Sequence, residues 1–394
     1  MTGRYAKWTK LQLINRIKEL ESQTTVPLKD FSSRGDNRPI DFNKYGQRHV
    51  AFKVAYIGWN YSGVAISHME DNSVESYLLS ALIKTSFIKD KDYAKLTRCG
   101  RTDKGVNAFG QVISCHLRSK FTKEELLMDN FESEDKKEYD YCRIINKVLP
   151  NDIRILGWSF VPEEFNARFD CMYRKYKYFF PCNDLDVGSM ALAANYFEGT
   201  HDFRNFCKVT PETLDQNYNR TVLEAKIVKS SESPHSLKSN SIAGFYEFHV
   251  KGHAFLYHQV RCMIAVLFLV GRGLEKPEIV KQLLDTDTFP VKPTYELAAG
   301  ENLVLYEAGY ENLIFTPVDP SFTFTEWFYK IEKSLVDVVV LSQMLSDAVS
   351  SDFCKEIYEK QSGPLLSKGC ATGKLAIYTK KSKPTDLINI LFEL

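Results

Sequence analysis

The sequence lacks the long apolar runs of membrane proteins, since no stretch approaches the roughly 18 residues of a membrane-spanning helix. Its N-terminal MTGRYAKWTKLQLINRIKELES also has no continuous apolar stretch of the signal-peptide kind, so we expect no secretion. The nine cysteines are odd in number and include no Cys-x-x-Cys pair. We therefore expect free thiols in a reducing compartment rather than a disulfide framework.

Neither sign of charge is in excess, because 51 basic and 50 acidic residues give a net charge of +1. The distribution is more informative: residues 1–53 hold 11 basic and 5 acidic residues, a net charge of +6. A neutral total can thus conceal a basic surface able to follow a phosphate backbone. The alternative is that these charges are merely solvated.

The composition, with 44% apolar and 26% charged residues, is typical of globular proteins. At about 150 residues per domain, 394 residues predict two or three lobes. We expect four regions: a basic N-terminal helix and linker (1–48), two catalytic lobes (49–161 and 162–314), and a C-terminal extension (315–394). The N-terminal helix is predicted from the spacing of Leu11, Ile14, Ile17 and Leu20.

Apolar periodicity within the two lobes predicts the order β-α-β-β-α-β twice. In the first lobe the strands are 49–58, 93–98, 111–118 and 152–160, and the helices are 73–84 and 141–149. In the second, the strands are 171–180, 220–228, 243–252 and 301–310, and the helices are 189–197 and 254–271. This order predicts an α+β fold of two ferredoxin-like lobes with mainly antiparallel sheets that face or join each other.

The densest group of reactive side chains is CGRTDKGVNAFGQV, Cys99 to Val112, between two predicted strands. Its two early glycines stand five apart as in a phosphate-binding loop, but Val106 and Asn107 occupy the positions of the required Lys and Ser or Thr. The sequence therefore argues against nucleotide hydrolysis. Cations on both sides of Asp103 predict an ionised carboxylate, able to act as a nucleophile or an electrostatic stabiliser. The alternative is a surface turn closed by an ion pair.

A second group interleaves cations with aromatic rings, as expected for RNA whose target base is flipped out. The cations are Arg168, Arg174, Lys175 and Lys177, and the rings are Phe169, Tyr173, Tyr176 and Tyr178. The alternative is a sheet strand with an aromatic core, which we favour for Tyr178. We expect His253 and His258 to be helix residues near the site and not metal ligands.

These motifs, in this order, resemble the TruA family of tRNA pseudouridine synthases over about residues 49–310. They are GRTDKGV, FNARFDCMYRKYKYFF (165–180), GHAFLYHQVRCMIAVLFLVGRG (252–273) and ELAAGENLVLYEAGY (296–310). The N-terminal WTKLQLINRIKELES and the late GPLLSK are most similar to the eukaryotic branch that modifies positions 38 and 39 of the tRNA anticodon arm. The resemblance implies a pseudouridine synthase fold and a homodimer that binds tRNA without cofactor or metal, in nucleus and cytoplasm.

The resemblance also implies roles for individual residues. Asp103 matches the family nucleophile, and Arg261 matches the basic residue that pairs with it. Tyr176 matches the tyrosine that packs on the target uracil, where its hydroxyl could transfer a proton at C5. Arg101 matches an arginine that helps to extrude the base. The expected substrate-binding residues are Gly100, Arg101, Thr102, Lys104, Arg168, Arg174, Lys175 and Tyr176.

Three questions stay open at this point. Asp103 could attack either the sugar or the uracil ring. A sister branch of the family acts on other tRNA positions and on messenger or small nuclear RNA. A non-catalytic RNA-binding protein with two ferredoxin-like lobes is less consistent with Asp103, because a pure binder avoids an anion that faces phosphate.

Overall fold

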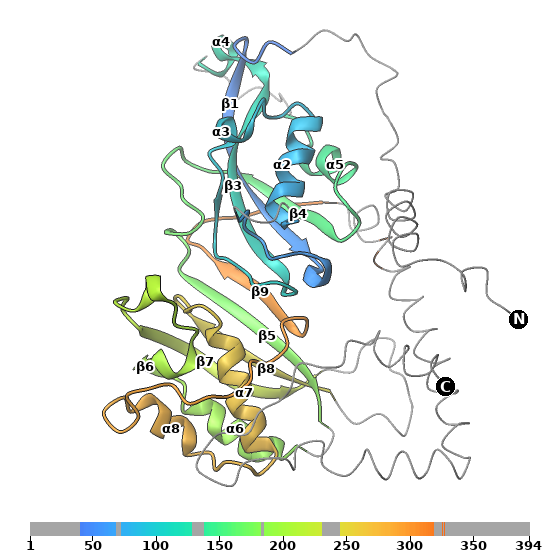
Figure 1. Cartoon of the computed structure of the whole chain (residues 1–394). Helices are drawn as coiled ribbons and strands as arrows, with labels where there is room; N and C mark the ends of the chain where they lie inside the picture. Colours follow the sequence, from blue (N-terminus) through green and yellow to red (C-terminus); the bar gives the residue numbers. More distant parts are fainter. Residues whose placement is uncertain are drawn as a thin grey trace, which may run out of the picture. The chain divides into compact units, whose positions relative to one another are not determined.

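Figure 1 shows the computed structural model of the chain, which describes residues 40–67, 72–127, 138–182, 185–230, 245–318, 325 and 327. The predicted N-terminal helix at Leu11 to Leu20 and most of the C-terminal extension lie outside these residues. Within the described residues, no helix has the length and apolarity needed to cross a membrane.

The first lobe has the predicted order of elements. These are β1 (Tyr45–Tyr56), α2 (Val74–Lys84), β2 (Thr97–Arg98), β3 (Asn107–Thr122), α5 (Tyr141–Asn146) and β4 (Ile153–Phe160). Part of the weak strand expected over 93–98 is instead the short helix α3 (Lys91–Ala94). The side chain of Asp90 caps this helix and Lys95 ends it in a left-handed conformation, so only two residues remain for β2. A further short helix is α4 (Lys123–Leu126).

The second lobe also follows the predicted order. Its main elements are β5 (Tyr173–Pro181), α6 (Val187–Asn195), β7 (Asn219–Lys229), β8 (Phe245–Gly252), α7 (Gln259–Gly271) and β9 (Leu303–Gly309). The structure also contains short elements that the sequence pattern did not predict, namely β6 (Gly199–Asp202), α8 (Ile279–Leu284), β10 (Thr316–Pro317) and the 3-10 turns η1 (Gly58–Asn60), η2 (Arg204–Phe206) and η3 (Pro211–Thr213).

Helix α7 begins five residues later than predicted, so placing His253 and His258 within it was wrong. His258 precedes the first helical residue and has a φ of 64°, which is incompatible with a right-handed helix. The apolar residues before it, such as Leu256, are buried in a loop, and periodicity alone cannot separate a buried loop from a buried helix.

The two lobes form one sheet, so of the two arrangements left open the sheets join rather than face each other. The strand order is β10-β4-β1-β3-β9-β5-β8-β7-β6, with β2 on β3. Within each lobe, the four predicted strands follow the ferredoxin-like order fourth, first, third and second. The junction is the parallel pair of β3 and β9, through Asn107 with Val304 and Ala108 with Leu305.

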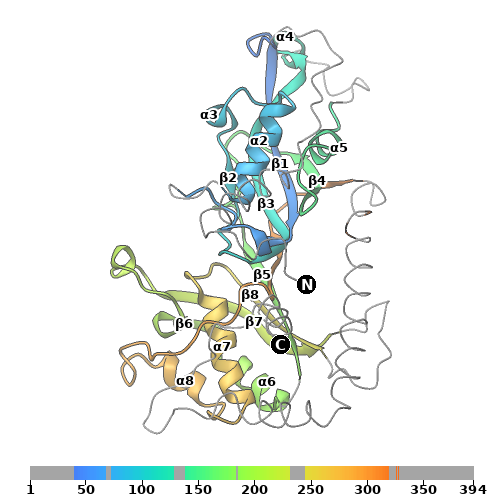
Figure 2. The same cartoon turned by 45° about the vertical axis from the view of Figure 1, so that its right-hand side comes forward.

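A single hydrophobic core runs along this sheet. In Figures 1 and 2, helices α2 and α5 lie beside the strands of the first lobe, and α6, α7 and α8 beside those of the second. Core residues from both lobes form one cluster, among them Phe52, Leu78, Tyr141, Tyr178, Phe248 and Met263. Tyr178 is 2% exposed, which confirms its predicted place in the core.

The junction depends on a glycine in β3. A Cβ on Gly110 would lie 2.5 Å from the carbonyl oxygen of Tyr306 and 2.7 Å from the Cα of Glu307, both in β9. Because backbone atoms cannot rotate away as a flexible side chain can, a larger residue would push β9 from β3.

We predict that Gly110→Ala lowers the free energy of unfolding by about 1–3 kcal/mol, the usual cost of overpacking. Urea denaturation followed by circular dichroism measures the change. The matched control is Gly100→Ala, because a Cβ at Gly100 would have no heavy atom within 4 Å. Its effect should stay within about 0.5 kcal/mol. Equal stability of the two variants would contradict the role of Gly110.

Candidate active site

The loop that carries Asp103 lies at the junction of the two lobes. It connects β2 to β3, and β9 pairs with β3 at the first residues after the loop. Asp103 therefore comes from the junction itself, Tyr176 from β5, which is the next strand after β9, and Arg261 from the first turn of α7.

Hydrogen bonds from the first lobe fix the backbone of this loop. The hydroxyls of Thr102 and Tyr56 are 2.7 Å apart, and the Gln111 side-chain amide donates to the carbonyl of Gly100 at 3.0 Å. Thr102 is 7% exposed. Two of the predicted substrate contacts, Gly100 and Thr102, thus contribute to holding Asp103 in place.

Both lobes also approach the loop closely through glycines. A Cβ on Gly63 would lie 2.5 Å from the Thr102 carbonyl oxygen, and its φ of +124° disfavours other residues as well. A Cβ on Gly300, which precedes β9, would lie 2.9 Å from the carbonyl oxygen of Lys104. The loop is therefore packed between backbone segments of the two lobes.

The structure brings Asp103 and Arg261 together. Nη1 of Arg261 lies 3.5 Å from Oδ2 of Asp103, and their side chains are 14% and 21% exposed. Nε of Arg261 donates to the carbonyl of Ala298 at 2.7 Å, which orients the guanidinium toward the carboxylate. The pairing implied by the resemblance is thus geometrically available, in a site largely shielded from water.

The electrostatic environment of Asp103 differs from the sequence-based expectation. Burial raises the pKa of the carboxyl group above its ordinary value, and Arg261 and Lys208 only partly oppose the rise. The cations that act on it come from the second lobe, whereas its neighbours Arg101 and Lys104 are exposed. A carboxylate whose pKa is raised by burial beside a fixed cation is a candidate for a reactive group.

His258 lies near the site, as expected, but its direct contact with Asp103 was not predicted from the sequence. Its Nε2 lies 3.5 Å from Oδ2 of Asp103. Burial and the positive charges of Arg261, Lys208 and Lys292 lower the pKa of His258 to about 3, so the imidazole is neutral at physiological pH. Its position three residues before Arg261 is the one sequence signal that could have indicated this contact.

Tyr176 lies buried on β5, beside the aromatic ring of Phe255. Its side chain is 9% exposed, and its ring meets that of Phe255 edge-on, with centroids 5.3 Å apart. Burial raises the pKa of Tyr176 far above its ordinary value, and the charge of Asp103 adds to the rise. The hydroxyl therefore stays protonated and can donate a hydrogen bond.

The cations of β5 are divided between the two faces of the sheet. Because side chains alternate along a strand, Arg174 shares the face of Tyr176, whereas Lys175 and Lys177 point to the opposite face. Nζ of Lys177 lies 3.0 Å from Oε2 of Glu247 there. Lys175 therefore does not share a face with Tyr176, and its contact with the substrate stays a prediction. Arg174 donates to backbone carbonyls, which conflicts with the predicted substrate contact.

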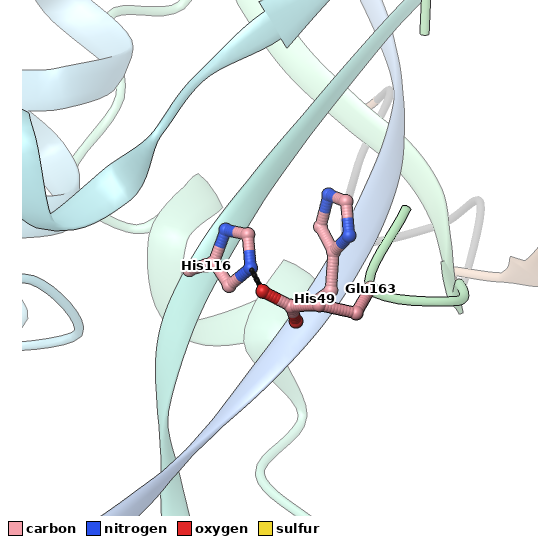
Figure 3. A group of neighbouring side chains, drawn as sticks. All are labelled: His49, His116 and Glu163. Atoms are coloured by element: carbon pink, nitrogen blue, oxygen red, sulfur yellow. Dashed lines mark hydrogen bonds and ion pairs between the residues drawn. The ribbon is translucent and has the colours of Figure 1, made fainter. Parts of the chain in front are cut away.

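Among the described residues, His49, His116 and Glu163 are close enough to suggest a metal site (Figure 3). The imidazole rings stack nearly parallel, with centroids 4.3 Å apart and planes 12° from parallel. A metal ion binds in the plane of each imidazole, so two stacked rings are poorly arranged to share one. Nδ1 of His49 donates to the carbonyl of Pro162 at 2.8 Å, and Nε2 of His116 lies 2.9 Å from Oε1 of Glu163. This group ties β1 and β3 to the connection between the lobes.

Comparison with known proteins identifies the family of the chain. Residues 193–311 match the family described as tRNA pseudouridine synthase. A tRNA pseudouridine(38/39) synthase of Mus musculus is 40% identical over 400 residues, covering 96% of this chain and 79% of the relative. The chain belongs to this family. The synthase of the same name from Homo sapiens is 39% identical (84% of this chain, 70% of the relative), and that of Saccharomyces cerevisiae is 40% identical (78% and 72%).

Arg261 should contribute more to turnover than Lys177, a cation on the opposite face of the sheet. We predict that Arg261→Gln lowers turnover at saturating tRNA by about 100-fold, because the guanidinium beside the Asp103 carboxylate is lost and a displacement of about 1 Å at a reacting atom can cost on the order of 100-fold in rate. Lys177→Gln is the charge-matched control: it also removes one partner of a buried pair, with Glu247, but on the opposite face of the sheet, so turnover per folded enzyme should stay within about twofold. Equal turnover of the two variants would contradict the pairing of Asp103 with Arg261.

The pH profile gives a second measurement on the same variants. An ionised nucleophile at Asp103 predicts that activity rises as the pH passes upward through the pKa of this carboxyl group. Because Arg261 lowers that pKa, its removal should move the rise to higher pH, whereas Lys177→Gln should leave it in place.

Proposed function

We propose that the chain isomerises uridine to pseudouridine at positions 38 and 39 of the tRNA anticodon arm, with Asp103 as the nucleophile. The relatives of about 40% identity that carry this activity in their names support the substrate and the positions. The observation that carries the proposal for Asp103 is its poorly solvated carboxylate 3.5 Å from Arg261 at the junction of the lobes.

The reaction needs a nucleophile and proton transfer, and it involves no net oxidation or reduction. The bond between N1 of uracil and C1′ of ribose breaks, the base turns, and a new bond joins C5 to C1′. The proton on C5 is lost and N1 gains one, so the product is an isomer of the substrate. The carboxylate of Asp103 can serve in attack on the sugar or on the ring.

Five side chains share the remaining tasks in this proposal. Arg261 keeps Asp103 charged and oriented, as its position beside Oδ2 allows. Tyr176 offers a flat ring and a protonated hydroxyl to a flipped-out base, in the manner of enzymes that act on extruded nucleotides. The exposed cations Arg101, Lys104 and Arg168 are placed to meet phosphates and to help extrude the base.

The proposal extends to assembly and location. The family resemblance supports a homodimer in which one tRNA contacts both copies, and activity in nucleus and cytoplasm. The two flanking regions, 1–48 and 315–394, would lie outside the catalytic lobes at 49–161 and 162–314. The excess of basic residues in the N-terminal region supports a contact with the tRNA backbone.

We predict that Asp103→Asn abolishes turnover while tRNA affinity stays within a few-fold of wild type, because phosphate contacts supply most of the affinity. Release of tritium from uracil C5 measures turnover, and mapping of pseudouridine in whole tRNA gives the positions. Activity within tenfold of wild type would exclude Asp103 as the nucleophile. For the wild-type protein, product at other tRNA positions would assign the chain to the sister branch. Wild-type protein that binds RNA but forms no product would belong to the non-catalytic class.

We predict that Tyr176→Phe keeps the stacking ring and removes the proton donor, so KM for tRNA should change little while kcat falls by about 100-fold. Tyr176→Leu should lose stacking as well and reduce tRNA affinity further. Steady-state kinetics on both variants tests this division. An unchanged kcat in Tyr176→Phe would restrict Tyr176 to stacking.

A further inference from the structure

One guanidinium beside the active site is bonded to the backbone of several segments at once. Nε and Nη2 of Arg174 donate to the carbonyl of Cys99 at 3.2 and 2.6 Å, and Nη2 also donates to that of Arg168 at 2.7 Å. Nη1 donates to the carbonyls of Cys171 at 3.1 Å and His253 at 2.5 Å. An arginine has five N–H donors, and these five bonds use all of them.

The four acceptors belong to the segments that carry the reactive residues. Cys99 lies four positions before Asp103 and opens its loop. Arg168 and Cys171 belong to the connection between the lobes, after β4 and before β5. His253 follows β8 and begins the segment that leads to Arg261. Arg174 thus joins the loop of one partner of the ion pair to the segment of the other.

We propose that Arg174 is a positioning residue for Asp103, whose guanidinium fixes the Asp103 loop against the segment leading to Arg261. The inference depends on the proposed use of Asp103 as the nucleophile. Arg174 itself acts through the backbone, and none of its donors is left for a tRNA phosphate.

A second anchor on the same residues supports this role. The buried Gln111 accepts from Sγ of Cys99 at 2.7 Å and donates to the carbonyl of Gly100 at 3.0 Å. Gln111 therefore holds the start of the loop from β3 while Arg174 holds it from β5. A displacement of about 1 Å at the reacting atom can cost on the order of 100-fold in rate, so this fixation bears directly on turnover.

The two roles of Arg174, positioning and phosphate binding, predict opposite effects of a lysine. An ammonium group has three donors at one point, whereas the planar guanidinium reaches four carbonyls in different directions. Lysine keeps the positive charge, so it would largely replace a phosphate contact. It cannot replace the bridge between segments.

The experiment compares Arg174→Lys and Arg174→Gln with the exposed, charge-matched control Lys229→Gln at the end of β7. Pseudouridine formation gives KM and the kcat per folded enzyme. The tRNA affinity is measured at several salt concentrations, which gives the slope of log affinity against log salt. We expect kcat to fall about 100-fold in both Arg174 variants, with KM and the salt slope unchanged and the control like wild type. Added guanidinium at millimolar concentration should restore part of the turnover of Arg174→Ala, and ammonium should not.

Two results would overturn the inference. One is that Arg174→Gln has a normal kcat but a raised KM and a salt slope lower by about one unit, while Arg174→Lys behaves almost like wild type. That result would make Arg174 a phosphate contact. The other is a lowered Tm with normal kcat per folded enzyme, which would make its role purely structural. The wild-type enzyme in the same assay tests the proposed function separately, because absence of product at positions 38 and 39 would refute that function whatever the variants do.

Discussion

The active site depends on the parallel pairing of β3 with β9, which turns two lobes into one sheet. The Asp103 loop enters β3 at this pair, so its position is set by both lobes. Asn107 reinforces the junction, since its Oδ1 accepts from the backbone of Gly58 at 2.8 Å and its Nδ2 donates to the carbonyl of Glu301 at 2.6 Å. Tyr176 is aligned by the same pairing, because its strand β5 lies next to β9. Movement at this junction would separate the carboxylate from both partners.

Two opposing effects set the pKa of Asp103: burial raises it and nearby cations lower it. Burial raises the pKa of Asp103 and Arg261 opposes the rise, so the carboxylate is weakly solvated yet paired. His258 lies at the same oxygen but stays neutral, because burial and the surrounding cations lower its pKa. His258 therefore adds no positive charge to the pair of Asp103 and Arg261. A reactive carboxylate needs such a balance, since full solvation would lower its reactivity and an unpaired buried charge would be very costly.

The sequence was sufficient for the order of the main elements, because alternation and helical spacing record which faces are buried. It was also sufficient to single out Asp103, Tyr176 and Arg261 through a resemblance. It could not predict the start of α7, since Leu256 is apolar in a loop as it would be in a helix. Nor could it predict the partners of Arg174, whose acceptors at Cys99 and His253 lie 75 and 79 positions away. The pKa shift of Asp103 also depends on burial, which arises only when the lobes join.

The cations around Asp103 differ in whether they are exposed or bonded to acceptors of the protein itself. Arg261 and Arg174 are engaged with acceptors of the protein itself, and arginine suits this because its planar donors hold two or more oxygens in fixed directions. Arg101, Lys104 and Lys208 are exposed. Lysine is a mobile point charge suited to a phosphate whose exact place varies between RNAs. Arg261 and Arg174 are thus available to position Asp103, whereas the exposed Arg101, Lys104 and Lys208 remain available to an RNA phosphate.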